Sequence, residues 1–163
     1  MFFRAETKNL DDMYSQFHSD LMAGDINAIK EKLKKCPALA TYEKKELMPP
    51  VIAAIHQIHH SYTHQNATIV LDILSEYKAN FNATHTYLHH HLEVNPLGWL
   101  LLNGGDSRLI KKLVDCGTDK NHSSVDKVKK FVRAYKQNAG FTYSTPCHEN
   151  PDECSPYQLV SKL

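Results

Sequence analysis

Histidine is the residue type in this sequence with the widest range of chemistry, and the 163-residue chain contains 11 of them. Most lie in two clusters: His56, His59, His60 and His64, and then His89 to His91 with His85 nearby. Imidazole binds transition metals, changes charge near neutral pH, and also serves as an ordinary polar group. The clusters therefore leave three alternatives, namely a metal site, a pH-responsive contact surface, or structural polar residues.

The metal site is the most specific of these alternatives. His56, His60 and His64 are spaced at i, i+4 and i+8, so they would line one face of a single helix running through all three. Two imidazoles on such a face can chelate a borderline metal such as zinc. The sequence has no His-Glu-x-x-His pattern, however, so a hydrolytic centre would lack its base. We expect the histidines to have a structural role. If they form a metal site instead, His56, His60 and His64 are its expected ligands.

No other group of residues has the pattern of a catalytic site. The sequence contains no nucleophile elbow, phosphate-binding glycine loop or kinase motif. Cys147 and Cys154 form one closely spaced pair, and without a second pair they indicate free thiols rather than a zinc site. We therefore predict that the protein is not an enzyme, has no catalytic residues and requires no cofactor.

Charge and hydropathy bear on the class of partner and on location. Lys and Arg total 19 and Asp and Glu total 18, so the chain lacks the basic excess that nucleic-acid binding requires. The opening residues MFFRAETKNLDD contain no apolar run of the length of a secretory signal, and Trp99–Leu102 is too short to span a bilayer. We expect a cytoplasmic protein, or one delivered into a host cell, that is monomeric when unbound.

Helices are the elements that must position these residues. Apolar residues from Leu10 to Leu21 follow a helical period, with Asn9 as the expected N-cap. A second stripe follows Gly24-Asp25 and ends before Pro37, which cannot continue a helix. The chain therefore begins with a helical hairpin.

The hairpin pattern recurs along the chain. Ile29, Val70 and Ile110 occupy equivalent places in three second helices, 41 and 40 residues apart. Prolines open the first helix of the later pairs, where the missing amide donor is not needed. Strand-type alternation is absent, so the sequence predicts an all-α fold of stacked helical hairpins.

The segment NPLGWLLLNGGDSRLIKKLVDCGTDKN resembles an ankyrin repeat. Its landmarks are Asn95-Pro96-Leu97 at the helix start, Gly104-Gly105 at the turn, Leu109-Ile110 at the aliphatic pair, and Gly117 to Asn121 at the end. A similar unit starts at Pro50-Val51 and continues into IVLDILSEYKANFNA, with Lys78 where glycine is usual. The spacing exceeds the ankyrin period of about 33 residues because HQIHHSYTHQN and ATHTYLHHHLEV add length. A degenerate hairpin array of another family is the alternative.

The resemblance implies an ankyrin-like solenoid in a single domain covering residues 1–163. It divides the chain into an N-terminal capping hairpin (1–37), two repeats (46–82 and 92–121) and a C-terminal cap or partial repeat (122–163). Ankyrin-like solenoids bind partner proteins through their concave face and the loops that join repeats. The protein would thus be an interaction module, as a regulatory adaptor or a secreted effector.

The two insertions are the expected contact surface of such a module. Aromatic side chains on a rigid stack are effective contact anchors, and the histidines share the same segments. The expected partner-binding residues are Tyr62, Tyr87, Leu88, His56, His60, His85, His89 and His90.

Two other features have structural interpretations. Trp99, the only tryptophan, occupies a leucine-like position, so we expect it in the core. The helix near residues 124–137 has a basic face, which we expect to be the solvated end of the stack, with an acidic partner or a membrane surface as alternatives. That face comprises Lys127, Lys129, Lys130, Arg133 and Lys136.

Overall fold

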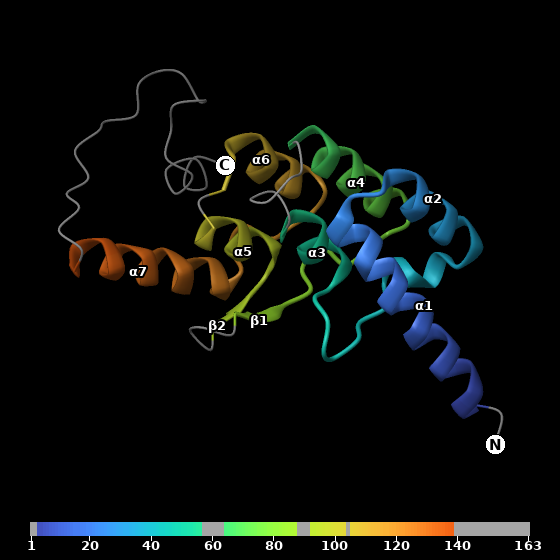
Figure 1. The fold of residues 1–163 in the computed structure, drawn as a ribbon. Coiled ribbons are helices and arrows are strands. Elements are labelled where there is room, and N and C mark those ends of the chain that lie inside the picture. Colours follow the sequence, from blue (N-terminus) through green and yellow to red (C-terminus); the bar gives the residue numbers. More distant parts are fainter. Residues whose placement is uncertain (1–2, 57–63, 88–91, 104, 139–163) are drawn as a thin grey trace. The chain divides into compact units, whose positions relative to one another are not determined.

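The computed structural model describes residues 3–56, 64–87, 92–103 and 105–138 (Figure 1). Side chains are described over the same ranges except for residues 3–8, 64–65, 87, 132 and 135–138. The chain divides into two compact units, an N-terminal unit, Met1–Ala83, and a C-terminal unit, Thr84–Leu163. Each unit is described by itself.

Two helical hairpins form the N-terminal unit. Its elements are α1 (Phe3–Ala23), α2 (Ile26–Lys35), the short 3-10 helix η1 (Pro37–Ala40), α3 (Pro50–His56) and α4 (His64–Glu76). The first helices α1 and α3 pack together, and so do the second helices α2 and α4. The apolar stripes read from the sequence form the core between them, because Phe17, Ile29 and Val70 are all fully buried.

Helix α1 is longer than the sequence pattern predicts. It begins at Phe3 rather than Leu10, so the expected N-cap Asn9 lies inside the helix. The prediction was wrong because the preceding residues Arg-Ala-Glu-Thr-Lys are mostly good helix formers that extend the helix beyond its apolar stripe. Helix α2 begins as expected after Gly24, with the Asp25 carboxylate accepting a hydrogen bond from the Ala28 amide at 3.0 Å.

The C-terminal unit contains a β-hairpin followed by three helices. Strands β1 (His85–Tyr87) and β2 (Leu92–Val94) pair antiparallel and precede α5 (Pro96–Leu102), α6 (Ser107–Asp115) and α7 (Ser123–Asn138). Helix α5 packs against α6 and α7, and strand β2 packs against α5 and α7 (Figure 1). The hairpin corrects the prediction that strands are absent, since three-residue strands are shorter than the alternation from which strands are predicted.

The described residues are nevertheless predominantly helical, with seven α-helices against two short strands. The coarse prediction of a helical protein is therefore confirmed. No helix in this part of the chain is both long and apolar enough to cross a membrane. Trp99 is 5% exposed and thus belongs to the core, as expected.

Helix α4 of the N-terminal unit and helix α6 of the C-terminal unit end in the same way. The Ala79 amide donates to the Leu74 carbonyl and the Lys78 amide to the Ser75 carbonyl, both at 3.0 Å. After α6 the corresponding donors are Thr118 and Gly117, at 2.9 and 3.0 Å. This is the Schellman pattern, which requires a positive φ at the residue after the helix. Lys78 has φ 57° and Gly117 has φ 99°, so lysine takes the conformation that glycine adopts more easily.

Candidate functional site

The structure describes part of the surface that the sequence predicts for partner binding. His85 and Tyr87 are the first and last residues of β1, and His56 ends α3. Tyr62, His60, Leu88, His89 and His90 lie outside the described residues. The expected contact residues that can be placed with their side chains are therefore His56 and His85.

The hairpin has one side chain anchored to a helix and others open to solvent. His85 pairs with Val94 in the register, and its ring centroid lies 5.9 Å from that of Trp99 on α5. Thr86 and Glu93 are paired across the strands and are both exposed. At the base of β1, the Thr84 hydroxyl donates to the Glu93 carboxylate at 2.6 Å. The hairpin thus presents polar groups while its base contacts the core.

Asn95 connects the hairpin to the helices. It directly follows β2, is fully buried, and caps α5 by accepting a hydrogen bond from the Gly98 amide at 2.9 Å. Its side-chain amide donates to the Asp119 carbonyl, and its backbone amide donates to the Ser124 hydroxyl, each at 3.2 Å. One buried side chain therefore fixes the end of β2, the start of α5 and the loop before α7.

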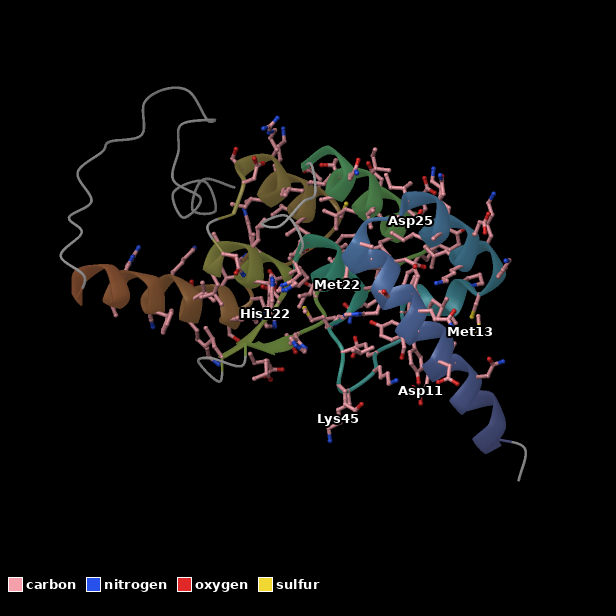
Figure 2. The ribbon with its side chains drawn as sticks, in the orientation of Figure 1. Asp11, Met13, Met22, Asp25, Lys45 and His122 are labelled. Atoms are coloured by element: carbon pink, nitrogen blue, oxygen red, sulfur yellow. The ribbon has the colours of Figure 1, made fainter. Side chains whose placement is uncertain are left out.

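His122, which is labelled in Figure 2, extends this network together with Ser124 to the start of α7. His122 Nδ1 lies 2.8 Å from Ser124 Oγ and accepts from the Ser124 amide at 3.3 Å. Ser124 Oγ also donates to Asn95 Oδ1 at 3.2 Å. We call Asn95, His122 and Ser124 the polar anchor. Which of His122 Nδ1 and Ser124 Oγ donates in their contact depends on the tautomer of the imidazole ring.

A serine beside a histidine can be a nucleophile with its base, but the described contacts of Ser124 are those of a buried group that bonds to its neighbours. Ser124 is only 2% exposed, and its hydroxyl accepts the Asn95 amide while facing two further partners. The Ser124 oxygen is therefore shielded from solvent and engaged by its neighbours. The anchor instead satisfies backbone groups that would otherwise be buried without partners.

Comparison of the chain with protein-family models, with curated proteins and with solved structures finds no match. Function is therefore inferred from the hairpin and its anchor.

No sequence pattern predicts that the residues of the polar anchor act as one unit. Asn95 was recognised at a helix start, but its partner Ser124 lies 29 residues away and no local pattern joins them. The part of the anchor formed by His122 and Ser124 did have a sequence signal. His122-Ser123-Ser124 immediately precedes an apolar stripe, and serine favours helix starts.

The metal alternative stays a prediction. Helix α3 ends at His56, α4 begins at His64, and His60 lies between them outside the described residues. Among the residues whose side chains are described, no group of three or more His, Cys, Asp or Glu residues could hold a metal ion.

A second loop is anchored in the N-terminal unit, where the segment between η1 and α3 is tied to α1. The Tyr14 hydroxyl donates to the Met48 carbonyl at 2.8 Å, and the Tyr42 hydroxyl donates to Asp11 at 2.7 Å. Burial raises the pKa of the Tyr14 phenol, as does the nearby negative charge of Glu43. Lys45 is exposed at the tip of this loop (Figure 2). No local sequence pattern predicts these contacts, because they join residues more than 30 positions apart.

Proposed function

We propose that the protein is a protein–protein interaction module of ankyrin-like type, acting in the cytoplasm, and that the β1–β2 hairpin is its principal contact element. The observation that carries the proposal is the combination of exposed positions on the hairpin with a fully buried anchor at its base. Thr86 and Glu93 are exposed, whereas Val94 and Asn95 are completely buried.

This combination favours binding for an energetic reason. A segment that must be ordered upon association loses conformational entropy, which weakens the complex. The hairpin is already ordered by strand pairing, by the contact of His85 with Trp99 and by the polar anchor. Polar side chains on a pre-ordered element can therefore contact a partner at a lower entropic cost.

The helical framework supports the same proposal. Stacked hairpins bury their apolar stripes against neighbouring hairpins and leave the connecting loops free to vary. In the N-terminal unit, α1 packs on α3 and α2 packs on α4, as the helices of neighbouring hairpins do in such a stack. Residues 84–94 lie between α4 and α5 in the sequence, at the position where an ankyrin-like repeat protein would have such a connection, and the resemblance to ankyrin repeats assigns partner binding to connections of this kind.

A site-specific photocrosslinker tests whether the hairpin contacts a partner. We expect a photoreactive phenylalanine analogue in place of exposed Thr86 to crosslink a discrete protein in lysate of the producing cell. The matched control carries the analogue in place of Lys111, which is exposed on α6 in the same unit. No crosslinked product at position 86, or the same product from position 111, would reject the hairpin as the contact element.

Substitution at the end of the hairpin gives a second test. We expect a Tyr87→Ala and Leu88→Ala double variant to lose capture of the crosslinked partner, because two large apolar contact groups are removed. Far-UV circular dichroism should remain unchanged. A Lys127→Ala and Lys130→Ala variant, altered at exposed positions on α7, is the matched control. Undiminished capture by the hairpin variant would contradict the assignment.

A further inference from the structure

Helix α7 has a strongly basic face that the proposed function does not use. The helix contains five cationic residues and a single acidic one. Lys127, Lys130 and Arg133 are exposed, and their spacing of three residues places them along one side of the helix. Val125 and Val128, on the opposite side, are completely buried. The apolar side therefore holds the helix in the C-terminal unit, and the basic side faces solvent.

The cations of this face are not used for ion pairs within the fold. Elsewhere in the chain, the side chain of Lys32 pairs with that of Asp20. Among the described residues, in contrast, no ion pair involves Lys127, Lys130 or Arg133. Helix α7 has 16 residues and α5 only seven, so α7 continues past the helix on which it packs (Figure 1). The basic face is therefore available to a ligand outside the described fold.

Helix stability does not explain these cations either. Cations stabilise a helix near its C-terminus, and Lys32, Lys34 and Lys35 lie in the last turn of α2 for this reason. In α7, Lys127 and Lys130 lie in the first half of the helix, away from that end. Like charges three or four positions apart on a helix also repel one another. The basic face opposes the stability of α7, which favours a role in binding.

The composition of the face favours an anionic lipid surface over the other anionic partners. Lysine is depleted in protein interfaces, where arginine and aromatic residues are enriched, and three of the four cations with described side chains are lysines. Nucleic-acid binding is disfavoured because Lys and Arg total 19 against 18 for Asp and Glu. Clusters of lysine and arginine on an amphipathic helix bind the anionic lipids of the cytoplasmic leaflet. Lysine, as a compact and hydrated point charge, can contact mobile headgroups without a fixed geometry.

We propose that the basic face of α7 docks the protein on membranes that contain anionic phospholipids, with its cations contacting the headgroup phosphates. The apolar side of α7 stays packed against α5 and β2, so the helix binds by charge and does not insert. The docking does not depend on the hairpin and goes beyond the proposed function. A partner bound by the hairpin would then be brought to the membrane surface.

Cosedimentation of the full-length protein with phospholipid vesicles tests the docking. We expect binding to vesicles of phosphatidylcholine mixed with phosphatidylserine, and none to vesicles of phosphatidylcholine alone. Raising the salt concentration from about 0.1 M to about 1 M shortens the Debye length from about 10 Å to about 3 Å, so it should release the protein. Equal binding to both kinds of vesicle, or no binding to the anionic ones, would overturn the proposal.

Matched charge variants locate the binding on α7. One cation near an anionic surface strengthens binding about fivefold, so a Lys127→Gln, Lys130→Gln and Arg133→Gln variant should bind anionic vesicles about 100-fold more weakly. Far-UV circular dichroism should be unchanged, because all three side chains are exposed. Equal losses in this variant and in its control would reject a specific role for α7. The control removes the same number of charges at exposed positions of α2, as Lys30→Gln, Lys34→Gln and Lys35→Gln.

Two further measurements separate the docking from other interactions. Retention of the protein on immobilised polyglutamate, without binding to anionic vesicles, would assign the basic face to an acidic protein and reject the lipid surface. The Tyr87→Ala and Leu88→Ala variant should bind anionic vesicles as the unmodified protein does, because its changes lie outside α7. Loss of vesicle binding in that variant would assign the docking to the hairpin and overturn the role of α7. Crosslinking from position 86 in the absence of vesicles tests the proposed function independently of these results.

Discussion

Helices α3 and α5 are built alike in their interiors and differ at their starts. Each has seven residues, begins with proline and buries six of its residues. Before α3 stands Pro49, which is itself buried and whose carbonyl accepts from the Ala53 amide at 2.9 Å. Before α5 stands Asn95, which bonds to Gly98, Asp119 and Ser124. Both short helices are therefore held by apolar packing, and α5 is additionally secured by a polar network at its start.

The difference indicates what the polar anchor adds. Apolar burial of about 1.5–3 kcal/mol per large side chain can hold a short helix against its neighbours, but it is not directional. Hydrogen bonds fix orientation, and a buried network must be complete to be favourable. The anchor lies where a β-hairpin enters a helix, so we infer that it fixes the direction in which the hairpin leaves the unit.

Removal of the anchor is the strongest way to test this comparison. We expect Asn95→Ala to destabilise the C-terminal unit by about 3 kcal/mol, because it removes a helix cap and leaves buried polar groups without partners. Trp99 is the only tryptophan in the sequence, so its fluorescence during urea unfolding reports on this unit alone.

Two control variants sharpen the result. Asn95→Ser keeps an acceptor for the Gly98 amide and should cost about half as much. Pro49→Ala, at the corresponding place before α3, should cost about 1 kcal/mol or less as followed by circular dichroism. Equal losses from Asn95→Ala and Pro49→Ala would contradict the view that the two helices are secured differently.

The contrast also shows why the sequence predicted the helices better than the anchor. Ile29, Val70 and Ile110 were placed in equivalent core positions from periodicity alone, and all three are fully buried. Burial of an apolar stripe is a local property that recurs every three to four residues. The anchor joins Asn95 to Ser124, 29 positions away, and Asn95 also bonds to Asp119, 24 positions away, so the geometry depends on how α5 and α7 pack. The hairpin was missed because its strands of three residues provide too little alternation.

The C-terminal ends of α4 and α6 also allow the two units to be compared, with smaller expected changes in stability. We expect Gly117→Ala to cost about 1–2 kcal/mol, because a φ of 99° is unfavourable for any residue with a Cβ atom. Lys78→Gly should instead stabilise the N-terminal unit by about 0.5–1 kcal/mol, since φ is 57° there.

Trp99 fluorescence measures the first variant, and amide exchange in α4 measures the second. Lys78→Ala is the matched control, because it removes the lysine side chain but keeps a Cβ atom at positive φ, so its stability should change little. Stabilisation by alanine as large as that by glycine would show that backbone conformation is not the cause.

The residues that follow Lys78 and Gly117 are expected to show the smallest change in stability upon substitution. Ala79 and Thr118 are 8% and 4% exposed and donate equivalent hydrogen bonds to the preceding helix. Among the described residues, the buried Thr118 hydroxyl has no hydrogen-bond partner. Thr118→Val keeps the shape of the side chain and removes that hydroxyl, so we expect a gain of about 1 kcal/mol in the Trp99 unfolding transition. Ala79→Thr should introduce the same defect into the N-terminal unit and lower its stability by a similar amount. A loss of stability in Thr118→Val would instead show that the hydroxyl is engaged, and the two helix ends would then differ in function as well as in sequence.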